Sequence, residues 1–277
     1  MLAGCRLSHL AQMAAACYFC VMCRFLAYLG GSIYLDELVC KPKHSLVRQS
    51  LRADEAKAVT NGDGFGVGWY GEREAPGVYR EVMPAWSDEN LLALCATVRS
   101  KLFLAHVRAA TGAGIARQNC HPFHYGPYLF IHNGQIGGYS QVRRTLEARL
   151  PDHLYAERRG GTDSELLFLL IIARIEMGET VQAAVSQVLK EVEAMLLVLK
   201  IAAPLRFSAA LADGQQVHAF RYASDHRAPS LYVHRYGENG WLVASEPLVD
   251  DHEGWEPIPQ GTVLHLNGQS CRSLQLG

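Results

Sequence analysis

Hydrophobic positions recur with two different periods along this chain. Alternation every second residue predicts strands, and recurrence every three or four residues predicts helices. Alternation of apolar and aromatic residues predicts a strand from Met22 that ends at Gly30–Gly31, and another within the glycine-rich segment 61–70. Apolar runs predict buried strands over 101–108 and 128–132. After Pro204, turns rich in Gly, Asp and Pro separate further predicted strands at 208–211, 217–221, 231–234, 241–245 and 262–266.

The middle of the chain carries helical spacing instead. Apolar residues recur every three or four positions over 84–99. A longer helix is predicted from Thr162 or Asp163 to a stop at Gly178, and a second from Thr180 to about Leu199. The order is strands, a helix pair and strands again, with no internal repeat or linker. It predicts one α+β domain rather than an alternating βαβ fold.

Composition narrows the classes of function. With 277 residues, 49% of them hydrophobic, the chain can bury a sizeable core. The 26 basic and 27 acidic side chains nearly balance, and the basic ones form no stripe or tail along the sequence that could bind phosphates. We therefore expect a small polar substrate and no nucleic acid. No run of apolar residues is long enough for a transmembrane helix, and we expect no membrane partner. Eight cysteines without a paired spacing indicate a reducing, cytoplasmic compartment.

Residues 1–21 differ in character from the rest of the chain. They are apolar and rich in small residues, like a secretory signal, but Arg6 is their only basic residue. A lipoprotein signal ending at Cys17 is an alternative. The interpretation we favour is an over-extended start, with Met22 as the true initiator. The chain is therefore divided into a leader or over-extended start, 1–21, and one domain, 22–277.

Cys23 is the candidate nucleophile. If Met22 is removed, Cys23 carries a thiol and a free α-amine on one residue, and an amine with a pKa near 8 can accept the thiol proton. The alternative is a structural cysteine at the start of a strand. Cys17, Cys20 and Cys23 also have the spacing of an iron–sulfur or zinc site, but the expected fourth cysteine is missing, because position 27 is Ala.

Three other clusters offer groups that the same chemistry needs. Arg108 follows an apolar strand, where it could bind a carboxylate or form an ordinary ion pair. The Asn133 amide and the Gly134 N–H could converge as an oxyanion hole, although Asn-Gly is also a common hairpin turn. Asp163 could bind a substrate ammonium group, act as a helix N-cap, or do both.

A zinc site is the competing interpretation of the segment 120–124. Cys120, His121 and His124 could bind zinc together with Cys23 or His132. No second C-x2-C or H-x3-H pair supports this interpretation, so we expect neither a metal nor a cofactor.

Considered together, these clusters resemble the class II glutamine amidotransferases, which carry an N-terminal nucleophile. The resemblance is greatest to a subgroup that includes the glutathione-degrading amidotransferase subunit of fungi and the γ-glutamyl hydrolase of the ergothioneine pathway. Eight motifs occur in the order of that subgroup, at Met22–Leu26, His44–Ser50, Asn61–Tyr70, Ala105–Thr111, Asn119–Phe123, His132–Gly134, Gly161–Glu165 and Ser245–Leu248.

The resemblance implies a four-layer αββα sandwich of two stacked antiparallel sheets. It also implies a role for each candidate residue, with Cys23 as nucleophile, Asn133 and Gly134 as oxyanion donors, Arg108 on the glutamyl α-carboxylate, Asp163 on the α-ammonium, and Thr111, His121 and His132 lining or supporting the pocket. One departure matters. The family's cysteine directly follows the initiator, whereas here 21 residues precede Met22 and would block the α-amine.

The function expected from this resemblance is a cysteine-nucleophile amidohydrolase that cleaves a γ-glutamyl amide through a thioester. Glutamine, glutathione and a γ-glutamyl thiol conjugate share the end that Arg108 and Asp163 would bind. A separate peptidase-like or synthase chain is the expected kind of partner. The alternative is a non-catalytic subunit that binds a γ-glutamyl ligand or scaffolds a peptidase complex.

Overall fold

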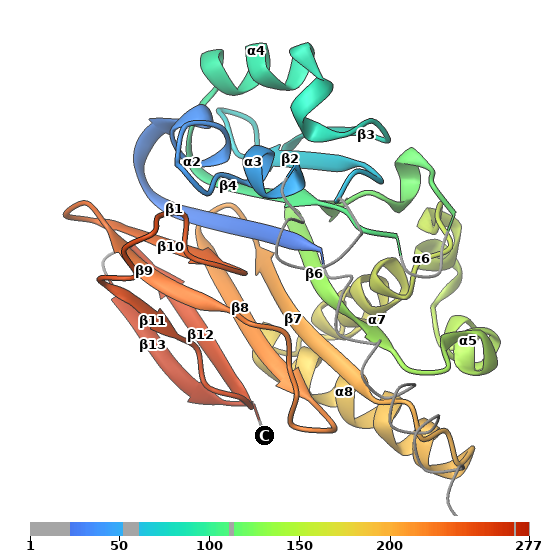
Figure 1. The fold of residues 1–277 in the computed structure, drawn as a ribbon. Helices are drawn as coiled ribbons and strands as arrows, with labels where there is room; N and C mark the ends of the chain where they lie inside the picture. The colour runs from blue at the N-terminus through green and yellow to red at the C-terminus, as the bar shows by residue number, and fades with distance from the viewer. Residues whose placement is uncertain (1–22, 52–60, 111–113, 269, 277) are drawn as a thin grey trace, which may run out of the picture.

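The computed structural model describes residues 23–51, 61–110, 114–268 and 270–276. Two antiparallel sheets form its centre, with the order β11-β9-β10-β1-β4-β2-β3 in the first and β13-β12-β8-β7-β6-β5 in the second. Helices cover the outer face of each sheet (Figure 1). The predicted α+β class, with two antiparallel sheets between helices, is confirmed.

The strands of the first sheet are β1 (Arg24–Tyr34), β2 (Phe65–Trp69), β3 (Gly77–Glu81), β4 (Arg99–Val107), β9 (Tyr232–Tyr236), β10 (Gly240–Ala244) and β11 (Trp255–Pro257). Those of the second sheet are β5 (Phe123–Tyr125), β6 (Tyr128–Ile136), β7 (Leu205–Ala212), β8 (Gln216–Ala223), β12 (Thr262–Asn267) and β13 (Ser270–Gln275). The helices are α2 (Asp36–Val39), α3 (Leu46–Leu51), α4 (Glu89–Thr97), α5 (Tyr139–Glu147), α6 (Asp152–Glu157), α7 (Asp163–Glu176) and α8 (Val181–Val198).

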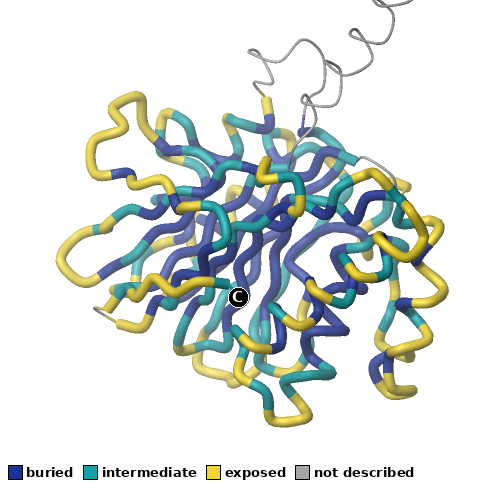
Figure 2. The backbone as a smooth tube through the Cα atoms, turned by 90° about the horizontal axis from the view of Figure 1, so that it is seen from below, coloured by how far each residue is buried: buried dark blue, intermediate teal, exposed yellow. Residues whose placement is uncertain are grey.

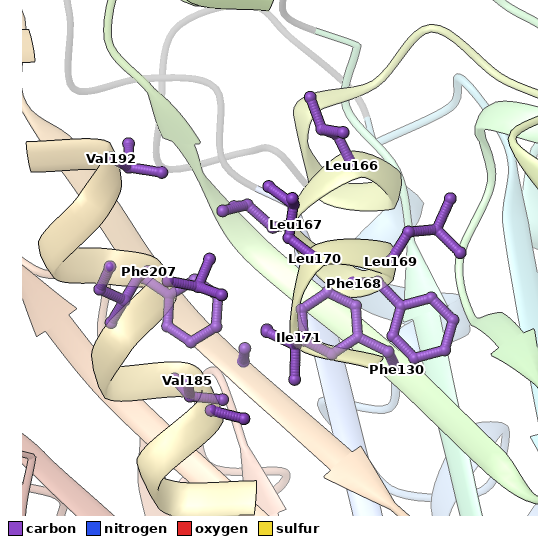
Figure 3. Close-up of a cluster of buried hydrophobic side chains, with 14 of the residues drawn as sticks. Phe130, Leu166, Leu167, Phe168, Leu169, Leu170, Ile171, Val185, Val192 and Phe207 are labelled. Carbon is purple, nitrogen blue, oxygen red and sulfur yellow. The ribbon is translucent and has the colours of Figure 1, made fainter. Parts of the chain in front are cut away.

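Buried hydrophobic side chains form three clusters, which correspond to the three interfaces between four layers. One cluster joins α2, α3 and α4 to the first sheet, and one lies between the sheets. The third cluster joins the four helices α5, α6, α7 and α8 to the second sheet. In this cluster Phe168 of α7 stacks on Phe130 of β6, with ring centroids 5.4 Å apart (Figure 3). The buried part of the chain therefore runs through the centre of the molecule, with exposed loops around it (Figure 2).

The first strand is longer than its sequence pattern predicts. β1 continues through Gly30 and Gly31 to Tyr34, with a register irregularity against β4 between Leu29 and Ile33. A Cβ atom at Gly30 would lie 2.6 Å from the Tyr28 hydroxyl, and that hydroxyl donates a hydrogen bond to the Gly31 carbonyl over 2.8 Å. Gly30 therefore accommodates the Tyr28 ring, and the strand continues through both glycines.

The two long helices begin and end close to the predicted positions, as α7 and α8. The first begins after Thr162, whose hydroxyl accepts the Glu165 N–H over 3.1 Å. The apolar residues 166–172 of α7 are all buried, because β6 and α8 contact different sides of this helix. α7 thus fixes the position of β6, which carries three of the candidate site residues, His132, Asn133 and Gly134.

Candidate active site

The same strands that build the core between the sheets carry the candidate site at one end. On β1, Phe25, Ala27 and Leu29 belong to the inter-sheet cluster, so by the two-residue period Cys23 lies on that inner face as well. On β4, Leu102 and Leu104 belong to the same cluster. The inner positions that continue this series are His106 and Arg108.

Register brings these residues to one end of the sandwich. Arg24 pairs with Val107 across β1 and β4, which places Cys23 beside Arg108. On β6, Leu129 and Ile131 face the inter-sheet core, so Asn133 continues their face. We call Cys23, His106, Arg108, His121 and Asn133 the polar end of the inter-sheet layer.

The Cys23 sulfur lies against the backbone of Ala109. The Ala109 N–H donates to Sγ over 3.4 Å, and the thiol is 3.5 Å from the Ala109 carbonyl oxygen. Burial raises the pKa of the Cys23 thiol, while the Ala109 N–H and the positive charge of Arg108 act in the opposite direction. Backbone and charge offset the effect of burial only in part, so the pKa stays raised and the thiol needs a base to take its proton.

Arg108 is buried and is held by the turn that precedes β2. Its guanidinium donates to the carbonyls of Asp63 and Gly114 over 3.3 and 3.4 Å, and its backbone N–H donates to the Gly64 carbonyl over 2.8 Å. The Asp63 carboxylate in turn accepts the Ala110 N–H over 2.8 Å. The turn at 61–64 therefore fixes both Arg108 and the backbone that contacts Cys23.

Asn133 and Gly134 lie inside β6, paired with Ser208 and Phe207 of β7. The Asn-Gly hairpin interpretation is therefore wrong, and the strand predicted to end at His132 continues to Ile136. The side-chain nitrogen of Asn133 is buried and has no hydrogen-bond partner among the described residues. A buried amide without a partner costs stability, which is typical of a group that binds something else.

The Gly134 N–H lies on the same edge of β6 as the Ile136 N–H, because alternate residues of a strand point the same way. Ile136 donates to the Asp163 carboxylate over 2.8 Å, so this edge faces away from β7 and toward the start of α7. A Cβ atom at position 134 would lie 2.0 Å from the Arg206 carbonyl oxygen and 2.6 Å from His132 Nε2. Close packing on β7, rather than access for a substrate, explains the glycine.

Asp163 is the first residue of α7, and its N-cap is Thr162, so the N-cap interpretation of Asp163 is wrong. One carboxylate oxygen accepts the Ile136 N–H, and the other accepts the Ser164 N–H over 2.8 Å. The oxygen that binds Ile136 retains a second lone pair for a ligand. The Asp163 carboxylate is therefore held rigidly at the edge of β6, beside the N–H of the second residue after Gly134.

His132 lies on the opposite face of β6 from Asn133. Its Nδ1 is 2.8 Å from the Ser164 hydroxyl and its Nε2 is 3.2 Å from the Arg206 carbonyl oxygen. Burial lowers the pKa of this imidazole. His132 joins β6 to α7 and β7, so its contacts support the strand and do not line the inter-sheet space.

The His121 ring packs against the His106 ring at a tilt of 33°, with ring centroids 4.2 Å apart. Both rings are buried, and none of their four nitrogens has a hydrogen-bond partner among the described residues. Burial, first of all, lowers the pKa of His106 to about 3 and the pKa of His121 well below its usual value, so both are neutral at physiological pH.

Two glycines of β2 make room for the segment that carries His121. A Cβ atom at Gly66 would lie 2.1 Å from the His121 carbonyl oxygen, and one at Gly68 would lie 2.8 Å from a Pro122 ring carbon. The glycine-rich pattern of 61–70 predicted a strand here but not the segment that packs on it. The two-residue spacing of Gly66 and Gly68, which places both on one face of a strand, was the available signal.

Asn119, to which the sequence pattern assigned no role, joins two loops at the site. Its amide donates to the Gly114 carbonyl over 2.8 Å, and its side-chain oxygen accepts the Gly161 N–H over 2.9 Å. Glu165 accepts the Gly160 N–H over 2.8 Å. These bonds hold the loop that contacts Arg108 against the loop that leads into Asp163.

Some predicted features lie outside the described residues. These are Thr111, Cys17, Cys20, Met22 and the leader 1–21. Within the described residues, no three or more His, Cys, Asp or Glu side chains form a group that could hold a metal ion. In the same part of the chain, no helix combines the length and apolar character needed to cross a membrane.

Comparison with known proteins adds an independent observation. The sequence matches the family "Glutamine amidotransferases class-II" over residues 40–236. The chain belongs to the class II glutamine amidotransferases. Cys23 precedes the matched segment, whereas Arg108, Asn133 and Asp163 lie within it.

Several relatives of this amidotransferase are similar over most of their length. It is 31% identical over 296 residues to the probable glutamine amidotransferase DUG3 of Saccharomyces cerevisiae, covering 90% of this chain and 83% of that protein. It is 29% identical over 242 residues to the gamma-glutamyl-hercynylcysteine sulfoxide hydrolase of Mycolicibacterium smegmatis, covering 86% of this chain and 92% of that protein. The chain is thus a glutamine amidotransferase-type enzyme related to γ-glutamyl hydrolases.

Solved structures confirm the fold of the amidotransferase. A glutamine aminotransferase class-II domain protein from Silicibacter pomeroyi superposes with a TM-score of 0.72 at 34% identity, covering 92% of this chain and 99% of that one. The glutamine phosphoribosylpyrophosphate amidotransferase of B. subtilis superposes with a TM-score of 0.63 at 16% identity, covering 92% of this chain and 49% of that one. The second likeness concerns the fold alone.

Proposed function

We propose that this protein hydrolyses γ-glutamyl amides, with Cys23 as the nucleophile and a γ-glutamyl thioester as the intermediate. The observation that carries the proposal is the Asn133 side-chain nitrogen, a buried donor without a partner among the described residues, which by strand alternation borders the same inter-sheet layer as Cys23. A donor of this kind is what a developing oxyanion requires.

The first half of the reaction forms the thioester. Cys23 Sγ attacks the γ-carbonyl carbon while its proton passes to the α-amine of the same residue. The Asn133 amide and the Gly134 N–H then donate to the carbonyl oxygen as it becomes an oxyanion. Collapse of the tetrahedral intermediate breaks the C–N bond, and the leaving amine takes the proton from the α-amine.

Water completes the reaction by attacking the thioester, with the α-amine again accepting a proton. Glutamate leaves and the Cys23 thiol is restored. This scheme requires Cys23 to be the first residue of the working protein, because an α-nitrogen in a peptide bond is not a base. Removal of residues 1–22, or initiation at Met22 followed by loss of that methionine, would satisfy the requirement.

Arg108 and Asp163 are proposed to bind the amino-acid end of the substrate. A guanidinium held by backbone carbonyls suits the α-carboxylate, and a carboxylate with a spare lone pair suits the α-ammonium. Glutamine, glutathione and γ-glutamyl thiol conjugates all carry this end. The name of the mycobacterial relative, a gamma-glutamyl-hercynylcysteine sulfoxide hydrolase, favours a γ-glutamyl conjugate, whereas that of the yeast relative, a probable glutamine amidotransferase, favours glutamine.

The test uses the chain expressed from Met22 and the chain expressed from Met1. Intact mass determines whether each begins at Cys23, and release of glutamate is measured with glutamine, glutathione and a γ-glutamyl thiol conjugate. We expect turnover only from protein that begins at Cys23. Cys23→Ala should lower the rate by roughly 10⁴-fold or more, since the covalent route is lost.

Cys271→Ala is the matched control, because this half-buried cysteine lies in β13, which β12, β8 and β7 separate from β6. It should retain full activity. Full hydrolysis by Cys23→Ala would contradict the mechanism. A correctly processed chain that binds these compounds but cleaves none of them would favour the non-catalytic subunit instead.

A further inference from the structure

The segment that follows β10 lies beside the first residues of β1. The register between these two strands ends with the pair Leu26 and Ala244, so the residues before Leu26 lie beyond the end of β10. Ser245, the residue after β10, is buried at this place. It begins the motif Ser245–Leu248, to which neither the candidate site nor the proposed function assigns a role.

Ser245 makes two hydrogen bonds to Phe25. Its N–H donates to the Phe25 carbonyl over 3.0 Å, and its hydroxyl oxygen accepts the Phe25 N–H over 3.1 Å. The hydroxyl thus replaces the backbone carbonyl that would accept this N–H in a regular antiparallel pair. Phe25 is two residues from Cys23, which is the chain end under the proposed function, and chain ends are poorly ordered unless they are tied down.

An ion pair holds the residue between them. Arg24 Nη2 lies 2.6 Å from Glu246 Oε1, and Arg24 Nη1 donates to the Cys23 carbonyl over 3.3 Å. The guanidinium therefore joins Glu246 to the backbone of Cys23 itself. Because the Glu246 side chain is partly exposed, water screens this pair, and we expect Ser245 to contribute more.

The segment that carries Ser245 and Glu246 is itself anchored to the outer layer of the first sheet. The His44 N–H donates to the Leu248 carbonyl over 3.0 Å, and the His44 imidazole contacts the Asp250 carboxylate. Leu248 is buried in the hydrophobic cluster beneath α2, α3 and α4. The start of β1 is thus fastened to a part of the molecule that is already packed.

We propose that Ser245 is a positioning residue for the nucleophile, which fixes β1 at Phe25 so that the Cys23 sulfur stays in place at the polar end. Glu246, acting through Arg24, is the second hold. A sulfur displaced by about 1 Å attacks a bound carbonyl roughly 10²-fold more slowly. The effect on catalysis rests on the proposed function, whereas the effect on the mobility of Cys23 does not.

Alkylation of Cys23 tests the hold without hydrolysis. The chain expressed from Met22 is treated with iodoacetamide, and cleavage after Glu releases Cys23 in a segment that ends at Glu37 and contains no other cysteine. The reagent reaches the half-buried thiol more often when the start of β1 opens. Ser245→Ala should therefore speed the alkylation about fivefold, the equivalent of one lost hydrogen bond. Glu246→Gln, at a partly exposed position, should speed it about twofold.

Ser100→Ala is the matched control. Ser100 is buried near the other end of β4, and its hydroxyl oxygen likewise accepts a backbone N–H, that of Leu102, over 3.1 Å. Both serine variants should lower the melting temperature by a few degrees. Only the change at Ser245 should alter the alkylation rate of Cys23.

Steady-state kinetics with glutamine, glutathione and a γ-glutamyl thiol conjugate give the second readout. For each compound that the wild type cleaves, Ser245→Ala should lower kcat roughly 10-fold or more and leave KM within about twofold, because Cys23 does not bind the amino-acid end of the substrate. Ser245→Thr, which keeps the hydroxyl, should recover most of the rate.

Two results would overturn the proposal. One is an alkylation rate in Ser245→Ala and Glu246→Gln equal to that in Ser100→Ala. The other is an active wild type in which Ser245→Ala has the same kcat as Ser100→Ala. A wild-type chain that cleaves none of the three compounds, while alkylation differs as expected, would contradict the proposed function and support the hold on Cys23.

Discussion

The two ends of the inter-sheet layer are built by the same strands but carry different kinds of inner side chain. At one end, β1, β4 and β6 contribute apolar inner side chains, which we call the apolar end: Ala27, Leu29, Leu102, Leu104, Leu129 and Ile131. At the polar end, the same inner positions hold a thiol, an imidazole, a guanidinium and an amide. The change occurs within one or two residues on each strand.

Packing explains the apolar end completely and the polar end poorly. His106, His121 and Asn133 are as buried as the leucines, yet between them five side-chain nitrogens lack a hydrogen-bond partner among the described residues. Such groups lower the stability of a fold. Their presence teaches that this end has been selected for something other than folding, so stability and activity should respond to different positions along the same layer.

Among changes that distinguish activity from stability at the two ends, the largest effect is expected at Asn133. Asn133→Ala should lower kcat by about 10²–10³, because an oxyanion donor is lost, with little loss of stability, because the side-chain nitrogen has no hydrogen-bond partner to lose among the described residues. Steady-state kinetics and urea unfolding measure the two quantities. Asn119→Ala is the matched comparison, since this buried asparagine uses both its amide nitrogen and its oxygen and should lose about 1–3 kcal/mol of stability. Equal destabilisation by both changes would contradict the distinction.

At Leu102 we expect a free-energy change of similar size, but in stability instead of activity. Leu102→Ala at the apolar end should lower the free energy of unfolding by about 3 kcal/mol through the cavity that it leaves. Activity per folded molecule should stay within about twofold, since Leu102 lies well before His106 along β4. Leu92→Ala, an exposed leucine of α4, is the control and should change stability by less than about 0.5 kcal/mol.

The smallest effect is a pH dependence that the polar end alone should show. His106 has a pKa of about 3 in the folded protein and near 6.5 when unfolded, so its contribution to stability is complete above pH 6.5. Below that, only the unfolded chain takes up the proton, and about 2 kcal/mol should be lost between pH 7 and pH 5.

Urea unfolding of the wild type and of His106→Asn at both pH values isolates this contribution, because all other titrating groups are common to the two proteins. The difference in stability between pH 7 and pH 5 should be smaller in the variant. An unchanged difference would mean that His106 is not held neutral by burial.

How far the sequence predicts this molecule depends on whether a signal is local. α7 and α8 were predictable because their apolar spacing and their capping threonines lie within or beside the helices themselves. β1 was predicted too short because Gly30 is explained by the Tyr28 ring and by β10, neither of which the local sequence reveals. The short elements α5, α6, β3, β5, β11 and β13 were not predicted at all.

The candidate site shows the same division. Strand register places Arg108 beside Cys23. Asn133 and Gly134 lie in a strand rather than in a turn, because pairing with β7 overrides the turn preference of Asn-Gly. Of the two roles expected for His132, lining the pocket or supporting it, its contact with Ser164 fits the second, because it holds β6 from the outer face. The bridging role of Asn119 depends on two loops far apart in the sequence, and no local pattern could reveal it.

The bond between the Ile136 N–H and the Asp163 carboxylate has one more consequence. The Asp163 carboxylate is bound to the N–H of Ile136, the second residue after Gly134 in the same strand. The distance from this carboxylate to the Gly134 N–H is therefore fixed by the strand, and neither a loop movement nor a rotamer change can adjust it. Under the proposed mechanism, that spacing measures the substrate's carbon chain. A β-aspartyl amide, one methylene shorter, could occupy the head-group site or reach the oxyanion donors, but not both at once.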